Sequence, residues 1–262
     1  MKKEKFLKLS KLKIVGIIFY STNNNLLGGI STLKTIGLIG GMSWESSSEY
    51  YRLINEEIKN KLGGLHSAKC ILYSVDFDEI ERYQAKGDWE SAGHTLGDVA
   101  ISLEKAGADF IVICTNTMHK VINYIEEKIN IPILHIADAT ANEIKKNNVN
   151  SVGLLGTKYT MIQDFYKSRI EANDIKVLIP DNEDIELINE VIYEELCLGK
   201  INQTSKEHFK KAIKSLVDKG AEGIILGCTE IGLLIKQEDS EVPIFDTTVI
   251  HAIESVNKAI DK

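Results

Sequence analysis

From residue 35 onward, short apolar runs rich in β-branched residues alternate with longer amphipathic stretches. The runs that we predict as strands cover residues 35–39, 70–75, 109–114, 133–136, 151–155, 176–179, 223–227 and 244–246. Each run is mostly apolar at every position, which is the pattern of strands buried on both faces beneath helices. The sequence therefore predicts strands that lie inside the molecule.

The amphipathic stretches between these runs predict helices over residues 45–61, 90–106, 185–198, 206–219 and 247–261. Three of them end directly before a glycine, namely Gly107, Gly199 or Gly220. Glycine just past the last turn is a common helix stop. Alternation of strands and helices predicts an α/β fold with mostly parallel sheets.

The chain also contains an internal repeat. TIGLIG at 35–40 resembles SVGLLG at 151–156, GADFIVICTNT at 107–117 resembles GAEGIILGCTE at 220–230, and IPI at 131–133 resembles VPI at 242–244. The matches keep the same order, with offsets of 116, 113 and 111 residues. We therefore predict two pseudo-symmetric lobes with the active site between them, at residues 34–137 and 150–245, and a C-terminal helix, 247–261, packed on the first lobe.

Residues 1–33 differ in composition from the rest of the chain. They carry a net charge of +5, which leaves −12 for the remainder because the whole chain carries −7. The segment has a weak signal-peptide outline, without a small-x-small cleavage site and with too few apolar residues to span a bilayer. We interpret it as an extension outside the fold. The acidic remainder argues against a nucleic-acid partner, and we expect no membrane partner.

The four cysteines, Cys70, Cys114, Cys197 and Cys228, are widely spaced. No CxxC pair, Cys/His ligand spacing or HExxH motif is present in the sequence, so we expect no metal site. Few and scattered cysteines suit a reducing compartment, and we expect a cytoplasmic location.

Four polar segments follow predicted strands, at residues 40–43, 114–117, 156–158 and 227–230. Parallel sheets bind ligands beyond the carboxyl ends of their strands, and a helix start favours a carboxylate or phosphate. The repeat gives Thr115 and Cys228 equivalent positions, so facing lobes would bring them to opposite sides of one ligand. A racemase needs this geometry. We expect a nearby helix start to lower the pKa of the Cys228 thiol, although a buried structural cysteine is the alternative.

Six segments together resemble the aspartate/glutamate racemase family: IGLIGGMSWESSSEYYRLINE, CTNTMHK, HIADAT, LLGTKYTM, YEELCLG and GCTEIGLL. The likeness runs from Leu33 to the C-terminus and is greatest to the broad-specificity and the L-aspartate/L-glutamate-specific racemases. It implies a homodimer active in D-amino-acid metabolism, which interconverts aspartate or glutamate enantiomers without pyridoxal phosphate or metal. It also suggests that residues 1–32 are an upstream extension, or that translation can start at codon 33.

The family normally uses two cysteines as its acid/base pair, but Thr115 stands at the first of these positions. Cys114 lies one residue earlier and should point into the lobe, because neighbouring strand residues face opposite ways. We therefore expect Thr115 to relay or donate a proton and Cys228 to be the stronger base, acting on the L-enantiomer.

The resemblance also implies substrate contacts. They are Met42, Ser43, Gln84, Asn116, Thr117, Lys158, Glu195, Thr229 and Glu230. Glu230 is expected to meet the substrate ammonium, and the Asn, Thr and Ser residues are also expected to cap helices. Arg52, Lys120 and Lys158 are the candidate cations for an acidic side chain, with Lys158 the best placed. We expect His119 and His135 to be structural.

Two other functions compete with racemisation. Decarboxylases of the same superfamily keep only the second cysteine, a pattern that Cys228 with Thr115 also fits. A non-catalytic binder of amino acids or carboxylates is the second alternative, since one acid/base cysteine is missing. Carbon dioxide release identifies the first, and an absence of Cα hydrogen exchange identifies the second.

Overall fold

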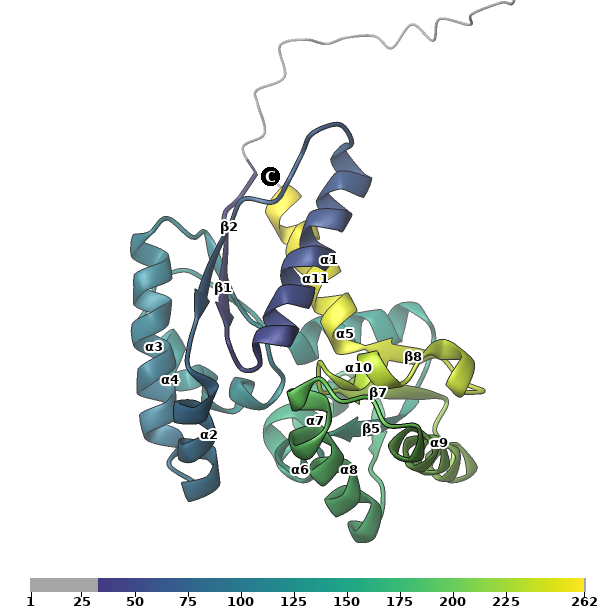
Figure 1. Ribbon diagram of the computed structural model, residues 1–262. Coiled ribbons are helices and arrows are strands. Elements are labelled where there is room, and N and C mark those ends of the chain that lie inside the picture. Colours follow the sequence, from purple (N-terminus) through teal and green to yellow (C-terminus); the bar gives the residue numbers. More distant parts are fainter. Residues whose placement is uncertain (1–32, 262) are drawn as a thin grey trace, which may run out of the picture. The chain divides into compact units, whose positions relative to one another are not determined.

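Two parallel four-stranded sheets organise residues 33–261, which are the residues that the computed structural model describes (Figure 1). The first sheet contains β1 (Ile36–Gly40), β2 (Cys70–Ser74), β3 (Phe110–Ile113) and β4 (Ile133–Leu134). The second contains β5 (Ser151–Gly156), β6 (Lys176–Leu178), β7 (Gly223–Gly227) and β8 (Ile244–Asp246). All eight predicted strands form, and the α/β fold class is confirmed.

The two sheets have the same topology. Their strand orders are β2-β1-β3-β4 and β6-β5-β7-β8, so in each sheet the first strand of the lobe lies between the second and the third. Every pairing is parallel. The repeat detected in the sequence therefore corresponds to a repeated supersecondary structure.

Side chains alternate between two cores on the first sheet, as the two-residue period of a strand requires. Ile36 and Leu38 pack with α1 (Trp44–Leu62) and α11 (Thr247–Ile260). Ile39 faces the other side, beneath helices α2 (Phe77–Lys86), α3 (Trp89–Lys105) and α4 (Ile122–Glu126). Burial on both faces explains why these strands are almost wholly apolar.

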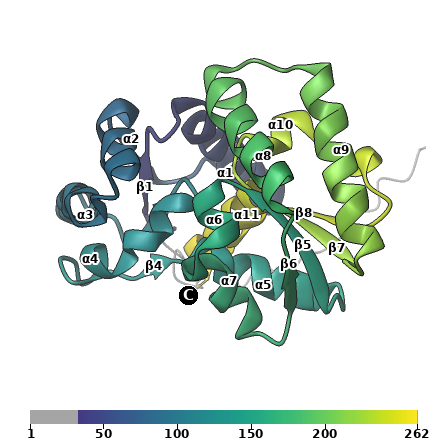
Figure 2. The ribbon, with the colours of Figure 1, turned by 90° about the horizontal axis from the view of Figure 1, so that it is seen from below.

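The second sheet is covered in a related way. Figure 2 shows α8 (Asn182–Glu194) and α9 (Gln203–Asp218) on one side of it, with α5 (Ile136–Lys146) and α7 (Asp164–Glu171) on the other. The short helices α6 (Lys158–Ile162) and α10 (Ile231–Leu234) follow the carboxyl ends of β5 and β7. Helix α11 contacts both α1 and α5, and the described residues form one compact unit, so the division into lobes stays a prediction.

Three expectations need correction. The edge strand β2 is not buried, because it pairs only with β1 and leaves Tyr73 exposed. The helix predicted over 185–198 breaks at Glu195, where a 3₁₀ turn (Leu196–Leu198) takes over. Leu33 packs against the core between the first sheet, α1 and α11 and so belongs to the fold, whereas residues 1–32 lie outside the described residues.

Among the described helices, none combines the length and the apolar character that a membrane crossing requires.

Candidate active site

The carboxyl ends of β1, β3, β5 and β7 meet around one small space, which we call the inner cavity. It is lined by Met42, Phe77, Gln84, Thr115, Asn116, Thr117, Thr157, Ile192, Tyr193, Cys197, Gly227, Cys228 and Glu230. Its volume of about 20 Å³ is close to that of one water molecule, so an amino acid enters only if the surrounding elements move apart.

Thr115 and Cys228 both line the inner cavity, one from each sheet. Each follows the third strand of its lobe, β3 or β7, which places the two side chains at corresponding points of the repeat. Cys114 is fully buried in the core between the first sheet and α1. The thiol beside Thr115 in the sequence is therefore turned away from the cavity.

The Cys228 thiol donates a hydrogen bond to Glu230 Oε2 across 3.0 Å. Burial, and then the negative charge of Glu230, raise the pKa of Cys228 well above its ordinary value. The expectation of a lowered pKa was wrong, because α10 is only four residues long and a carboxylate reaches back to the sulfur. In this closed arrangement Cys228 is a neutral thiol.

Glu230 is a buried carboxylate with three neutral donors. Ser43 Oγ donates to Oε1 at 2.6 Å, while Thr229 Oγ1 and the Cys228 thiol donate to Oε2 at 2.6 and 3.0 Å. Glu230 is 3% exposed, and the described residues offer it no ion pair. Buried charges are usually paired, so this carboxylate is suited to receiving a cationic group of a ligand.

Asn116 and Thr117 line the inner cavity from the loop after β3. Asn116 Nδ2 donates to Thr247 Oγ1 at 3.0 Å, but Asn116 Oδ1 is buried without a hydrogen-bond partner among the described residues. The hydroxyls of Thr117 and Thr157 are 3.0 Å apart and join the two lobes. Asn116 therefore carries a buried acceptor oxygen that the described residues leave unused.

The expected helix caps are present only in part. Ser43 caps α1 by accepting a hydrogen bond from the Ser46 N–H, and it also reaches Glu230. Asn116 makes no side-chain cap to the following 3₁₀ turn (Thr117–Val121). The hydroxyl of Thr229 is directed to Glu230, and Thr229 does not line the cavity.

Gln84 and Met42 reach the inner cavity as expected. Gln84 projects from α2, with Nε2 2.9 Å from Met118 Sδ. Its Oε1 accepts a 3.2 Å hydrogen bond from the hydroxyl of Tyr193 on α8, so the contact ties the two lobes together.

Four predicted contacts do not line the inner cavity, namely Ser43, Lys158, Glu195 and Thr229. Lys158 pairs with Glu186 outside it, and Glu195 accepts hydrogen bonds from Ser205 at 2.6 Å and Asn202 at 3.3 Å. Glu195 therefore ties the end of α8 to the start of α9. Of the other cations, Arg52 pairs with Glu49 and Glu56 on the surface of α1, and Lys120 lies over the Trp89 ring.

Sequence reasoning missed Phe77, Thr157, Ile192, Tyr193 and Cys197. Thr157 follows β5 in the polar segment at 156–158, where the repeat already indicated a ligand-binding strand end. Tyr193 and Cys197 lie in YEELCLG, four residues apart, a spacing that places side chains on one side of a helical segment. That spacing was the available signal for a cavity-facing side of this segment.

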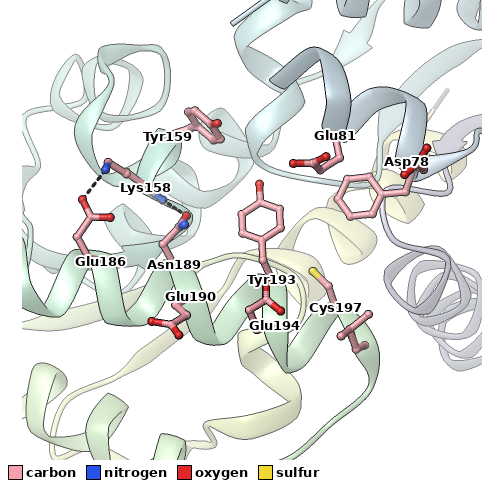
Figure 3. Close-up of a pocket in the computed structure, with 12 residues that line it drawn as sticks. Asp78, Glu81, Lys158, Tyr159, Glu186, Asn189, Glu190, Tyr193, Glu194 and Cys197 are labelled. Atoms are coloured by element: carbon pink, nitrogen blue, oxygen red, sulfur yellow. Dashed lines mark hydrogen bonds and ion pairs between the residues drawn. The ribbon is translucent and has the colours of Figure 1, made fainter. Parts of the chain in front are cut away.

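A wider space of about 960 Å³, which we call the vestibule, adjoins the inner cavity (Figure 3). Phe77, Tyr193 and Cys197 line both spaces. The remaining lining of the vestibule comes from α2, α6, α8 and the turn after α8. Because these three residues line both spaces, the vestibule borders the inner cavity.

Three buried histidines lie close together, and one of them, His119, contacts the loop that carries Thr115. His119 Nδ1 donates to the Thr115 carbonyl at 2.9 Å, and its other nitrogen accepts from a backbone N–H of α5. His251 donates to a backbone carbonyl of β4 and accepts from the Tyr50 hydroxyl. His135 caps α5. Burial lowers the pKa of all three, to about 3 for His119 and about 4 for His251. The contacts of these neutral histidines are structural, as expected for His119 and His135.

The structure defines an α/β protein with two parallel four-stranded sheets, whose strand ends meet around a small cavity with a polar lining. The chain belongs to the Asp/Glu/hydantoin racemase family, whose model matches residues 39–254. The resemblance seen in the sequence is thereby confirmed.

Individual relatives agree with this assignment. The broad-specificity amino-acid racemase RacX of Bacillus subtilis is 25% identical, over 85% of this chain and 96% of its own length. A Yersinia pestis protein described as a candidate Asp/Glu racemase is 56% identical with a TM-score of 0.82, over 87% of this chain and 100% of that one. An aspartate racemase homologue from Pyrococcus horikoshii OT3 is 38% identical with a TM-score of 0.76, over the same shares.

Proposed function

We propose that the protein is an amino-acid racemase in which Thr115 and Cys228 transfer protons on opposite faces of Cα. The observation that carries this proposal is that the two residues, equivalent in the repeat, line one inner cavity from different sheets. Aspartate and glutamate are the substrates that family membership suggests first. Neutral and basic amino acids belong in the same assays, because no Lys, Arg or His lines the inner cavity within the described residues.

Substrate binding supplies the charge that Cys228 needs to become a base. An α-ammonium placed between Glu230 and Asn116 Oδ1 offsets the Glu230 charge that raises the thiol pKa. The thiol then releases its proton to solvent as the lobes open, which leaves a thiolate to remove the Cα proton of the L-enantiomer.

Thr115 completes the reaction on the opposite face. Its hydroxyl proton moves to the Cα carbanion, and a water proton replaces it on Oγ1, so Thr115 relays a solvent proton. A threonine hydroxyl is a very weak acid and an even weaker base at neutral pH. The relay therefore favours abstraction from the L-enantiomer by Cys228 over the reverse sequence.

A chiral assay with both enantiomers of each amino acid tests this function. We expect Cys228→Ser to lower kcat by at least about 100-fold, the scale of a lost general acid or base. Cys70→Ser is the matched control, because Cys70 lies on β2 and does not line the cavity. Full activity of Cys228→Ser, or equal losses in both cysteine variants, would contradict the proposal.

Two alternative functions give different results in related assays. A decarboxylase releases carbon dioxide from a malonate-type substrate with Cys228 intact, and a binder shows an affinity for amino acids without Cα exchange. The Asn116–Thr117 pair in the inner cavity and the named racemase relatives favour racemisation over both.

We also propose that the protein is a homodimer that acts in D-amino-acid metabolism in the cytoplasm, without a nucleic-acid or membrane partner. Trp44 and Tyr51 on α1, together with Leu72 and Tyr73 on β2, are exposed apolar side chains of the kind that protein interfaces cover. The C₂ dimer is also the commonest assembly of soluble proteins. Light scattering after size-exclusion chromatography measures the mass, and a monomer would contradict the dimer.

A further inference from the structure

Two cysteines line the inner cavity. Cys228 reaches it from the end of β7, and Cys197 reaches it from the 3₁₀ turn Leu196–Leu198 that follows α8. This turn packs against α10, which begins shortly after Cys228. A negative charge on the Cys197 sulfur is among the causes that raise the pKa of Cys228, so the two sulfurs lie within interaction range. The two thiols therefore share one small space.

The other two cysteines are remote from this space. Cys114 is fully buried in the core between the first sheet and α1, and Cys70 lies on the edge strand β2. Neither lines the inner cavity. The chain contains four cysteines, all of them among the described residues and all free thiols. Cys197 is therefore the one thiol that shares the cavity with Cys228.

Cys197 differs from Cys228 in its access to solvent. Cys197 also lines the vestibule of about 960 Å³, and Figure 3 shows it on the wall of that space next to Tyr193. Cys228 is 8% exposed and does not line the vestibule. Proton transfer by Thr115 and Cys228 leaves Cys197 without a catalytic role. An accessible thiol beside a second, more buried thiol is the arrangement of an oxidisable pair.

Building on the proposed racemase function, we propose that Cys197 and Cys228 form a reversible disulfide in the presence of a peroxide, and that this bond switches the racemase off. The bond consumes the sulfur that removes the Cα proton, and it fills the space that the substrate has to enter. Reduction by a dithiol restores both thiols and the activity. Disulfides inside cells are usually transient and redox-sensing, which is the role that this pair would have.

The oxidation takes two steps with hydrogen peroxide. The Cys197 thiolate attacks one peroxide oxygen and the O–O bond breaks, so that Cys197 becomes a sulfenic acid and hydroxide leaves, which takes up the thiol proton as water. The Cys228 sulfur then attacks the sulfenic sulfur and the S–O bond breaks, so that a second water leaves with the Cys228 proton. Two thiols lose two electrons in total, and one peroxide is reduced to two waters.

The closed arrangement protects the pair from oxidation. Burial, and then the negative charge of Glu230, raise the pKa of both Cys197 and Cys228, so both are protonated and react slowly. A disulfide also requires the two Cα atoms to come within about 7 Å of each other. Opening of the cavity hydrates the thiols and frees the short turn that carries Cys197 to shift toward β7. Oxidation is therefore limited by the same movement that admits an amino acid.

The experiment treats the reduced full chain with hydrogen peroxide and maps its peptides without reduction. We expect a peptide pair joined through Cys197 and Cys228, identified by mass spectrometry. Racemase activity should fall in proportion to the joined fraction, by about 100-fold when joining is complete, which is the scale of a lost general base. Dithiothreitol should separate the peptides and restore the activity.

Two variants separate this bond from other damage by peroxide. Cys197→Ser should give no joined peptide, and it should keep most of its own starting activity over the time in which the wild type is inactivated. The matched control Cys70→Ser, at a cysteine outside the cavity, should behave as the wild type.

The proposal is overturned if inactivated wild type lacks the joined peptide, if a different pair of cysteines is joined, or if Cys197→Ser is inactivated as fast as the wild type. The wild-type peptide map needs no variant, so it decides the pairing even if Cys197→Ser fails to fold. A lack of Cα exchange with every amino acid would remove the proposed function, and the same map would still decide the pairing.

Discussion

Lowering the pH from about 7.5 to about 5.5 should destabilise the fold through His119, His135 and His251. The three side chains are at most 4% exposed, and the His119 ring centroid lies 4.5 Å from that of His135 and 5.9 Å from that of His251. Burial, and then the neighbouring rings, lower the pKa of His119 and His135, while burial lowers that of His251. The positive charge of Arg169 also lowers the pKa of His119 and His135, because it disfavours a proton on either ring.

The magnitude follows from proton linkage. The pKa values of His119 and His251 are about 3 and about 4 in the folded protein, against 6.5 for an unperturbed histidine. The unfolded chain therefore binds more protons as the pH falls through 6.5, and stability is lost in that window. Each histidine contributes about 1.4 kcal/mol between pH 7.5 and 5.5, so the cluster contributes about 4 kcal/mol. This is a large part of a typical unfolding free energy of about 5–15 kcal/mol.

Urea denaturation at several pH values measures this loss. His135→Asn removes one titrating group but keeps a side chain that caps α5 well, so it should reduce the loss by about 1.4 kcal/mol. His66→Asn, at an exposed position, should leave the loss unchanged. Equal pH dependence in the wild type and in His135→Asn would refute the reasoning.

Three further predictions concern single contacts. Gly41→Ala should lower the unfolding free energy by more than about 2 kcal/mol, because the added Cβ would lie 2.2 Å from a backbone oxygen at a φ of +91°. Gly64→Ala, which adds a Cβ in open space at a φ of +58°, should cost less, and thermal melts compare the two variants. Tyr193→Phe removes the hydrogen bond to Gln84 and should lower the unfolding free energy measured by urea titration by about 1 kcal/mol. Unchanged stability would contradict a stabilising role for this contact between α8 and α2. Glu195→Gln should lower the unfolding free energy by about 1–2 kcal/mol, because its hydrogen bonds to α9 are weakened, and should leave kcat unchanged. A lower kcat would show that Glu195 takes part in the reaction.

The central strands could be predicted from sequence because burial on both faces leaves a nearly continuous apolar run. β1 and β7 are buried at every residue and agree closely with the predicted ranges. The edge strand β2 has a similar composition but is largely exposed, since edge position depends on the order of the strands in the sheet. The break at Glu195 depends on its contact with α9, which no local pattern records.

In the candidate site, too, the features that follow from the sequence pattern could be predicted and those that depend on long-range packing could not. Thr115 and Cys228 could be predicted because the repeat relates their strand ends. Tyr193 and Phe77 reach the inner cavity only because α8 and α2 fold over it, which is a consequence of long-range packing. The direction of the Cys228 pKa shift also depended on packing, since it reflects where the Glu230 carboxylate lies.

The stereochemistry of deuterium uptake at Cα in heavy water tests the two-sided proton transfer most directly. With the wild type and an L-amino acid, deuterium should enter the D-product in the first turnovers. In Thr115→Ala, Cys228 alone should exchange the Cα hydrogen of the L-enantiomer with retention, and inversion should be nearly abolished. Unimpaired inversion in Thr115→Ala would contradict the account, because a side chain other than Thr115 would then deliver the second proton.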